Sequence, residues 1–265
     1  MKPPFAYYGG KTRLAKKIVA LFPEHAHYVE PFAGSLSVLL AKDPDVSLVE
    51  TVNDADELLM NFWKQLRDEP DEMRRLMALT PHSRRETDLN REQVASIEDP
   101  LERARQTWSL LAQSRNGTLL PTGWRFFRKG SKATTNMRDY LNAYWDRSGG
   151  LVARLHNVSL ECRDAIEVIK DYGRDDDTLI YCDPPYLGDV AVSRYPKDFA
   201  STEQHSDLAA ALNSCTATVL LSGYDSYLYR DLFAGWWKHE FEASTTNGSG
   251  DHKRTEVVWS NREIM

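Results

Sequence analysis

The sequence predicts an α/β protein built on a doubly wound, Rossmann-like sheet. Helix-like and strand-like segments alternate over residues 1–66, and the alternation returns over residues 150–265. The stretch between them, residues 67–149, is polar and mainly helical in its apolar spacing. We therefore expect one α/β domain in two sequence pieces, interrupted by a helical insertion. A chain of 265 residues can bury the core of such a domain without disulfides.

The elements of the first piece follow from apolar spacing and from the residues that end each run. The first strand stops at Pro31, which cannot continue a ladder of hydrogen bonds. The second strand stops at the polar pair Asn53-Asp54. The expected elements are a helix over 12–22, a strand over 27–30, a helix over 35–41, a strand over 46–52 and a helix over 58–66.

The second piece contains a compact apolar run, residues 178–182, that is typical of a buried strand. Short helices and strands alternate on both sides of it. The expected elements are a strand over 158–161 with a helix starting at Asp164, the strand 178–182, a helix over 202–212, a strand over 218–221, a helix over 226–233, and strands near 239–241 and 256–259.

Composition narrows the class of protein. The three cysteines, Cys162, Cys182 and Cys215, are scattered without metal-ligand spacing, so we expect reduced thiols and no metal site. The first residues lack the apolar segment of a secretory signal, and no apolar run is long enough to cross a bilayer. These observations favour a cytoplasmic protein with no membrane partner, and nothing in the sequence indicates an obligate protein partner.

Charge is distributed unevenly. The net charge of −6 argues against a general nucleic-acid binder, but residues 103–138 contain no Asp or Glu and carry eight Lys or Arg. A basic segment within an acidic chain fits a local surface that contacts phosphates. The alternative interpretation is a solvated helix face followed by a basic loop.

The strongest chemical signal is Asp183-Pro184-Pro185-Tyr186, directly after the buried strand 178–182. Ligands of open α/β sheets bind beyond the carboxyl ends of strands, and two prolines fix the loop there. Asp183 supplies a hydrogen-bond acceptor and Tyr186 an aromatic face. This platform can hold an amino group while a ring stacks beside it.

Three weaker signals precede it. In the run 29–37, Gly34 permits a close ligand approach and Phe32 can cover an apolar or cationic group. Asp54 follows the second strand, where an acid commonly accepts from ribose hydroxyls, although it can equally cap the next helix. Lys11, after Tyr7-Tyr8-Gly9-Gly10, can meet a carboxylate or remain an exposed turn lysine.

Together these segments resemble the Dam-like (D12 class, alpha group) family of adenine-specific DNA methyltransferases. Residues 7–11 resemble the family's N-terminal cofactor motif, residues 29–38 its Phe-x-Gly-x-Gly loop, and residues 180–186 its catalytic strand and tetrapeptide. Residues 246–250 and the basic pair after them look like its C-terminal segment. The motifs occur in the family's order, which is more specific than any one of them.

The resemblance implies transfer of a methyl group from S-adenosylmethionine to the N6 amino group of an adenine flipped out of double-stranded DNA. Alternatives are cytosine-N4 methylation, more distantly RNA methylation, and a catalytically silent DNA-binding protein on the same fold. A restriction-modification role is also implied. The expected cofactor residues are Tyr7, Lys11, Pro31, Phe32, Gly34, Asp54, Asp164 and Asp183, and the expected catalytic residues are Asp183, Pro184 and Tyr186.

The chain departs from the family in two places. Leu36 stands where the family has its second loop glycine, and the insertion only loosely resembles the family's target-recognition domain. We expect specificity to come from the stretch 116–132, unless its aromatic residues are buried and merely pack the insertion. The expected DNA-binding residues are Arg115, Asn116, Arg125, Arg128, Lys129 and Lys132.

Overall fold

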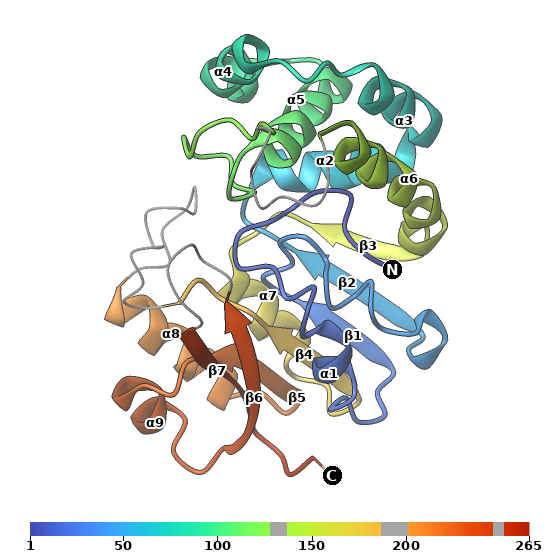
Figure 1. Cartoon of the computed structure of the whole chain (residues 1–265). Coiled ribbons are helices and arrows are strands. Elements are labelled where there is room, and N and C mark those ends of the chain that lie inside the picture. Colours follow the sequence, from blue (N-terminus) through green and yellow to red (C-terminus); the bar gives the residue numbers. More distant parts are fainter. Residues whose placement is uncertain (128–136, 187–200, 246–251, 265) are drawn as a thin grey trace.

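A single twisted sheet of seven strands organises the protein (Figure 1). The computed structural model describes residues 1–127, 137–186, 201–245 and 252–264. In this part of the chain the strand order is β3-β2-β1-β4-β5-β7-β6. The strands are β1 (His27–Glu30), β2 (Val49–Asn53), β3 (Val158–Glu161), β4 (Thr178–Cys182), β5 (Thr218–Gly223), β6 (Trp237–Thr245) and β7 (His252–Ser260).

The first five strands pair in parallel, and β7 runs antiparallel between β5 and β6. The order reverses at β1 and β4, so the crevice of a doubly wound sheet opens beyond their carboxyl ends. The predicted α/β fold class is therefore confirmed. The helices are α1 (Ala15–Val19), α2 (Glu57–Asp68), α3 (Pro70–Leu79), α4 (Arg84–Gln93), α5 (Pro100–Gln113), α6 (Met137–Leu155), α7 (Ala165–Tyr172), α8 (Thr202–Asn213) and α9 (Tyr227–Leu232). Two short 3-10 helices, Pro44–Val46 before β2 and Val94–Ser96 after α4, complete the described elements.

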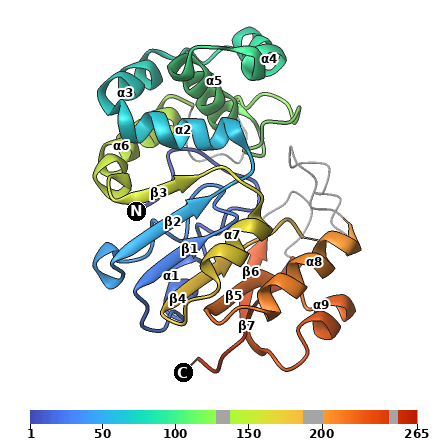
Figure 2. The same ribbon diagram turned by 180° about the vertical axis from the view of Figure 1, so that it is seen from behind.

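Alternate residues of each central strand enter two separate cores. Tyr28 and Leu179 pack on the side of α1, whereas Val29 and Ile180 pack against α7, α8 and α9. The helices lie accordingly on opposite faces of the sheet, as the front and back views show (Figures 1 and 2). This alternation is the period-two pattern that strands buried on both faces require.

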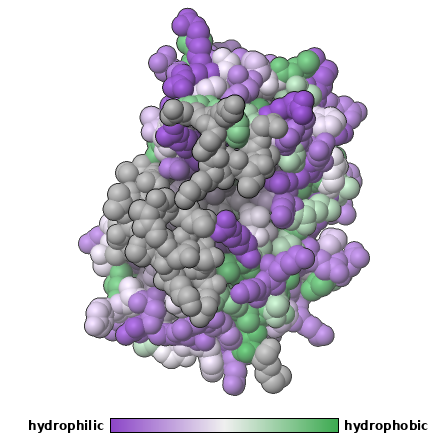
Figure 3. Space-filling model, viewed as in Figure 1, coloured by the Kyte–Doolittle hydropathy of each residue, from purple (hydrophilic) through white to green (hydrophobic). Residues whose placement is uncertain are grey.

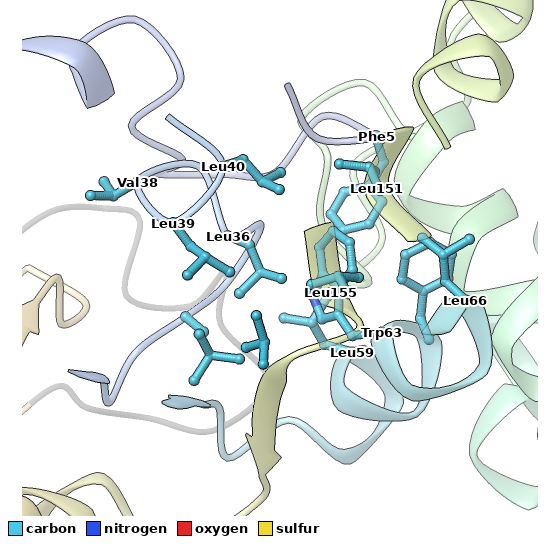
Figure 4. Packing of buried hydrophobic residues seen from close by; sticks show 14 of the residues in the cluster. Phe5, Leu36, Val38, Leu39, Leu40, Leu59, Trp63, Leu66, Leu151 and Leu155 are labelled. Atoms are coloured by element: carbon cyan, nitrogen blue, oxygen red, sulfur yellow. The ribbon is translucent and has the colours of Figure 1, made fainter. Parts of the chain in front are cut away.

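Helices α2 to α6 form a separate layer at the β3 end of the sheet (Figures 1 and 2). Their core is continuous with that of the sheet: Leu36 and Leu39 face Leu59 and Leu155 in the close view of Figure 4. The expected boundaries near residues 66 and 150 fall within α2 and α6, so these two helices belong to both parts. The division into a sheet domain and an insertion remains a proposal.

The N-terminal segment runs beneath the helical layer and is fixed there. The indole of Trp108 in α5 donates to the Pro4 carbonyl at 2.8 Å, and Phe5 packs between Phe62 and Trp63 of α2. The start of the chain is thereby tied to helices α2 and α5 before it reaches the sheet.

Two helix predictions differ from the structure. The first helix is confined to α1, because the chain tightens into 3-10-type turns after Val19 and then meets Pro23. The helix expected over 35–41 is wrong: those residues form a series of turns. The reason is the backbone at Leu36, whose φ of 56° is left-handed and cannot continue a right-handed helix.

The face seen in Figure 3 is mostly hydrophilic over the helical end, with scattered hydrophobic residues. Among the described residues, none of the helices combines the length and apolar composition that a bilayer crossing requires.

Candidate active site and cofactor cleft

A cleft of about 380 Å³ opens beyond the carboxyl ends of β1, β2 and β4 and next to the start of α7. Its volume lies within the roughly 300–1,000 Å³ that small-molecule sites occupy. The eight residues expected to bind the cofactor all line it: Tyr7, Lys11, Pro31, Phe32, Gly34, Asp54, Asp164 and Asp183. Chain segments that are far apart in the sequence therefore converge on one cavity.

Asp54 joins two of these segments. Its Oδ2 accepts from the Gly34 amide at 2.9 Å and its Oδ1 from the Asp56 amide at 3.0 Å. Asp56, and not Asp54, is the N-cap of α2, because its carboxylate accepts from the Leu58 amide. The helix-cap interpretation of Asp54 is therefore wrong, and the residue instead holds the glycine turn against the end of β2.

The glycine turn is tightly packed. Gly34 has a φ of 49°, and a Cβ there would lie 3.0 Å from the Tyr7 ring. Its carbonyl accepts from the Trp63 indole at 3.1 Å. The turn is thus held between the N-terminal motif and α2, and a larger side chain would push Tyr7 away from the cleft.

Asp164 also lines the cleft. It caps α7, accepting from the Ile166 amide at 2.8 Å, so a helix N-terminus and its acid both border the cleft. Pro31 and Phe32, directly after β1, also line the cleft.

Lys11 is buried and makes an ion pair with the carboxylate that follows β4. Its Nζ lies 2.9 Å from Asp183 Oδ1, 3.2 Å from the Gly9 carbonyl oxygen and 4.7 Å from the centre of the Tyr186 ring. The exposed-lysine interpretation is wrong for this reason. Pro184 is buried behind the cleft, whereas the next residue, Pro185, lines it.

Tyr186 lies beside the cleft, not on its lining. Its ring packs edge-on against Tyr224 at 4.5 Å, and its hydroxyl reaches Asp183 Oδ1 at 3.2 Å and Glu256 Oε2 at 3.1 Å. Burial raises the pKa of the Tyr186 phenol well above its ordinary value, and the charges of Asp183 and Glu256 raise it further. The phenol therefore keeps its proton at neutral pH.

Sequence analysis missed three residues of this region. Tyr224 follows β5 as Asp183 follows β4, which was a usable signal. Glu30 ends β1, lines the cleft and is buried, and burial raises its pKa to about 8 against the hydrogen bonds from Tyr28 and Leu39. Glu256 lies in the middle of β7, where nothing in the sequence distinguishes it from any strand residue.

Three of the six residues expected to contact DNA, Arg115, Asn116 and Arg125, lie in the described chain that follows α5. Arg115 and Asn116 are exposed, whereas Arg125 is half-buried, with its guanidinium 4.6 Å from the Tyr140 ring centre and donating to the Arg115 carbonyl at 2.8 Å. The other three expected residues, Arg128, Lys129 and Lys132, lie outside the described residues.

Aromatic rings stack beside these arginines. The His82 and Trp124 rings are stacked at 4.2 Å, and Trp124 is stacked in turn with Phe126 at 5.8 Å. Arg84 lies over both Trp124 and Phe126, and Arg115 lies over Phe126. Trp124 is half-buried, but Phe126 and Phe127 are exposed, so this stretch is not simply packing for the insertion.

The acid-free segment is not a continuous positive surface. Arg105 is largely buried and pairs with Glu102 of its own helix and Glu86 of α4, at 2.6 and 2.9 Å. Acidic residues outside the segment thus pair with a base inside it. The eight Lys and Arg counted in the sequence therefore overstate the unpaired positive charge. Among the described residues, no group of three His, Cys, Asp or Glu side chains is placed to hold a metal.

Sequence comparisons match most of this chain to known proteins. The sequence model of the D12 class N6 adenine-specific DNA methyltransferase family matches residues 7–247. The type II methyltransferase M1.LlaDCHI of Lactococcus lactis subsp. cremoris is 25% identical over 98% of this chain and 95% of its own length. The DNA adenine methylase of Vibrio cholerae serotype O1 is 26% identical over 94% of this chain and 92% of its own.

Among solved structures, a SAM-dependent methyltransferase from Agrobacterium tumefaciens aligns with a TM-score of 0.39 and 9% identity, over 95% of this chain and 61% of its own. The fold assignment rests on the strand order given above and not on that distant alignment. The family match decides between the alternatives that the sequence left open, since it names an enzyme and adenine as its target. With most of its length matched, the chain belongs to the D12 class N6 adenine-specific DNA methyltransferase family, and it methylates the N6 amino group of adenine in DNA.

Proposed function

We propose that the cleft binds S-adenosylmethionine, with Asp54 at the ribose, the Asp164 end of the cleft at the adenine ring, and Lys11 near the methionine carboxylate. The observation that carries this proposal is the convergence of the eight expected residues on one cavity. Asp54 suits its role because a carboxylate has about four acceptor positions, and the two backbone amides leave room for hydroxyl donors. When bound, the cofactor supplies an activated sulfonium methyl group.

In the same proposal, Asp183 and Pro184 hold the amino group of the flipped adenine. Both recorded contacts of Asp183, from Lys11 and Tyr186, are made to Oδ1, and no side chain of the described ranges bonds Oδ2. Oδ2 is therefore placed to accept from the amino group, together with the Pro184 carbonyl. Two acceptors draw that nitrogen toward tetrahedral geometry, which frees a lone pair that the aromatic ring otherwise delocalises. As the nitrogen gains the methyl group, its surplus proton has the Asp183 carboxylate beside it.

The insertion is proposed to bind double-stranded DNA, with the stacked rings of His82, Trp124 and Phe126 next to Arg84 and Arg115. Exposed aromatic and guanidinium faces can stack on bases or fill the gap left by a flipped base, while arginines contact phosphates. Flipping costs a few kcal/mol, which such contacts offset. Because its substrate is DNA, we propose that the protein acts in the cytoplasm. We also propose a role in restriction-modification.

The test is transfer of labelled methyl groups to unmethylated DNA by Asp183→Ala. Loss of the acceptor should lower the single-turnover rate by at least about 10²-fold, the scale of removing one preorganised electrostatic contact. Asp225→Ala is the matched control, because Asp225 also follows a central strand but pairs with Arg230 and Lys238 on the surface. Near-normal transfer by Asp183→Ala would contradict the assignment.

A further inference from the structure

The hydroxyl of Tyr186 lies between two carboxylates that come from different parts of the fold. Asp183, in the loop after β4, is 3.2 Å away, and Glu256, in β7, is 3.1 Å away. Glu256 is 70 residues from Tyr186 in the sequence. A sheet strand thus reaches across to the loop that carries the catalytic tetrapeptide.

The two carboxylates do not compete equally for the single proton of the hydroxyl. Asp183 Oδ1 already has the Lys11 ammonium at 2.9 Å. Glu256, by contrast, accepts from one side chain among the described residues, the Tyr186 hydroxyl. Because one hydroxyl donates one hydrogen bond, its proton is best used toward Glu256, whose charge it helps to solvate.

The strand that carries Glu256 is well anchored. β7 is paired on both sides, to β5 from Val257 to Ser260 and to β6 along its whole length. Tyr186, which Glu256 contacts, and Tyr224, which packs on the Tyr186 ring, belong to loops that follow β4 and β5. Glu256 is itself paired with Phe241 of β6, so it is a fixed acceptor that can orient a ring that a loop alone would leave free to turn about its side-chain torsions.

We propose that Glu256 is a positioning residue for Tyr186: by accepting its hydroxyl hydrogen bond, Glu256 holds the ring between Lys11 and Tyr224 in the orientation that the target adenine stacks on. This inference rests on the proposed roles of Asp183 and Tyr186. Glu256 itself touches neither the adenine nor the cofactor in this account. Its effect is on the rate of methyl transfer and not on cofactor affinity.

The experiment is a double-mutant cycle on the single-turnover rate at saturating DNA and cofactor. Glu256→Ala should lower the rate by roughly ten- to a hundredfold, the range of a hydrogen bond to a charged group. Tyr186→Phe removes the same bond from the other side and should lower it by the same factor. Combined, the two changes should cost no more than either alone.

Two variants act as controls. Glu256→Gln keeps an acceptor oxygen and should stay within about threefold of the parent rate, since its amide can still receive the tyrosine proton. Glu240→Ala changes an exposed glutamate on the neighbouring strand β6 and should leave the rate unchanged. Cofactor affinity by calorimetry and melting temperature should be the same in all of these variants.

Several outcomes would overturn the inference. A wild-type rate in Tyr186→Phe would do so even if Glu256→Ala fails to fold. Equal loss from Glu256→Ala in the parent and in the Tyr186→Phe background would mean that Glu256 acts independently of Tyr186. A Glu256→Gln variant as slow as the alanine variant would mean that the charge matters and not the acceptor. Asp183→Ala separates the two proposals: normal transfer in that variant removes the proposed function itself, whereas loss there with an additive cycle removes only the role of Glu256.

Discussion

Two ion clusters of this protein use the same chemistry at opposite ends of the parallel strands. In the closed cluster, Glu50 near the start of β2 accepts from Lys42 at 3.0 Å and from both terminal nitrogens of Arg154. In the open cluster, Lys11 pairs with Asp183 beyond the end of β4, and Tyr186 adds its hydroxyl. The first joins α6 to the sheet, and the second borders the cofactor cleft.

The two clusters differ in how many oxygens of the central carboxylate are occupied by groups of the chain. Both carboxylate oxygens of Glu50 accept hydrogen bonds, and Lys42 also donates to Ser47 and to the Asp43 carbonyl. Asp183 receives its contacts on one oxygen and its side chain is 16% exposed. A carboxylate whose two oxygens the chain satisfies by itself stabilises the fold, whereas one with an oxygen left open at a cleft can accept from a ligand. Removing residues from each should therefore affect different quantities.

The largest expected effect is on stability, from Glu50→Ala. This change leaves the Lys42 and Arg154 cations buried without a counter-charge, which typically costs about 3–5 kcal/mol. Urea unfolding should show this loss, while the folded fraction keeps its cofactor affinity. The matched control is Glu72→Ala, which breaks an exposed pair with Arg75 and should change stability by less than about 1 kcal/mol. An equally small effect of Glu50→Ala would mean that the closed cluster is not structural.

Glu30 is affected by the charges of both clusters, and its ionisation should make the stability of the protein depend on pH. Its pKa is raised to about 8, mainly by burial, with smaller contributions from the negative charges of Asp183 and Glu50. The folded protein therefore holds a proton that the unfolded chain releases near the ordinary value of 4.5. Between these values the folded state binds more protons, so stability falls as pH rises, by at most about 1.4 kcal/mol per pH unit.

Glu30→Gln should remove that fall, because the amide mimics the protonated acid and keeps the oxygen that accepts from Tyr28 and Leu39. The variant should match the parent near pH 5 and exceed it by roughly 4 kcal/mol near pH 8. Thermal melts at a series of pH values measure this. Parallel pH profiles for both proteins would show that Glu30 is ionised throughout.

A smaller effect, on activity instead of stability, is expected from Lys11→Met in the open cluster. The aliphatic part of the side chain is retained, and Asp183 is exposed enough for water to replace the ammonium, so stability should change by no more than about 1 kcal/mol. Methyl transfer should fall by roughly ten- to a hundredfold, the range of a lost charge-assisted hydrogen bond. Lys16→Met, at an exposed position of α1, is the control. If Lys11→Met unfolds the protein but leaves transfer intact, the contrast between the two clusters fails.

Sequence reasoning located the open cluster better than the closed one, for a physical reason. Strand ends carry local signals, so β1, β4 and the position of Asp183 followed from apolar runs and prolines. Pairing between distant charges carries no local signal, which is why the neutralisation of Arg105 by Glu86 and the reach of Glu256 to Tyr186 were not predictable. The turns at residues 35–41 were missed because a leucine gives no indication of a left-handed backbone.

The smallest expected effect concerns that leucine, on the segment that runs from the glycine turn of the cleft to the closed cluster. Leu39 in this segment donates to Glu30 and its carbonyl accepts from Arg154, while the Gly34 amide donates to Asp54. Leu36 between them is fully buried and is the non-glycine residue with a positive φ among those described. Its backbone conformation thus follows from contacts on both sides, at a cost of about 1–2 kcal/mol for a residue with a Cβ.

Leu36→Gly and Leu36→Ala both remove the buried side chain, and each should lose a few kcal/mol. In ordinary positions glycine is the less stable of such a pair by about 0.4–1 kcal/mol, because the unfolded chain gains freedom. At Leu36 the order should reverse, with glycine the more stable by roughly 0.5–1 kcal/mol, since only alanine keeps the left-handed strain. Val38, buried in the same segment without a positive φ, gives the matched pair in which alanine should remain ahead. Urea midpoints of the four variants measure this difference. If glycine is the less stable residue at both positions, the backbone at Leu36 is unstrained, and the contacts on either side of it do not impose its conformation.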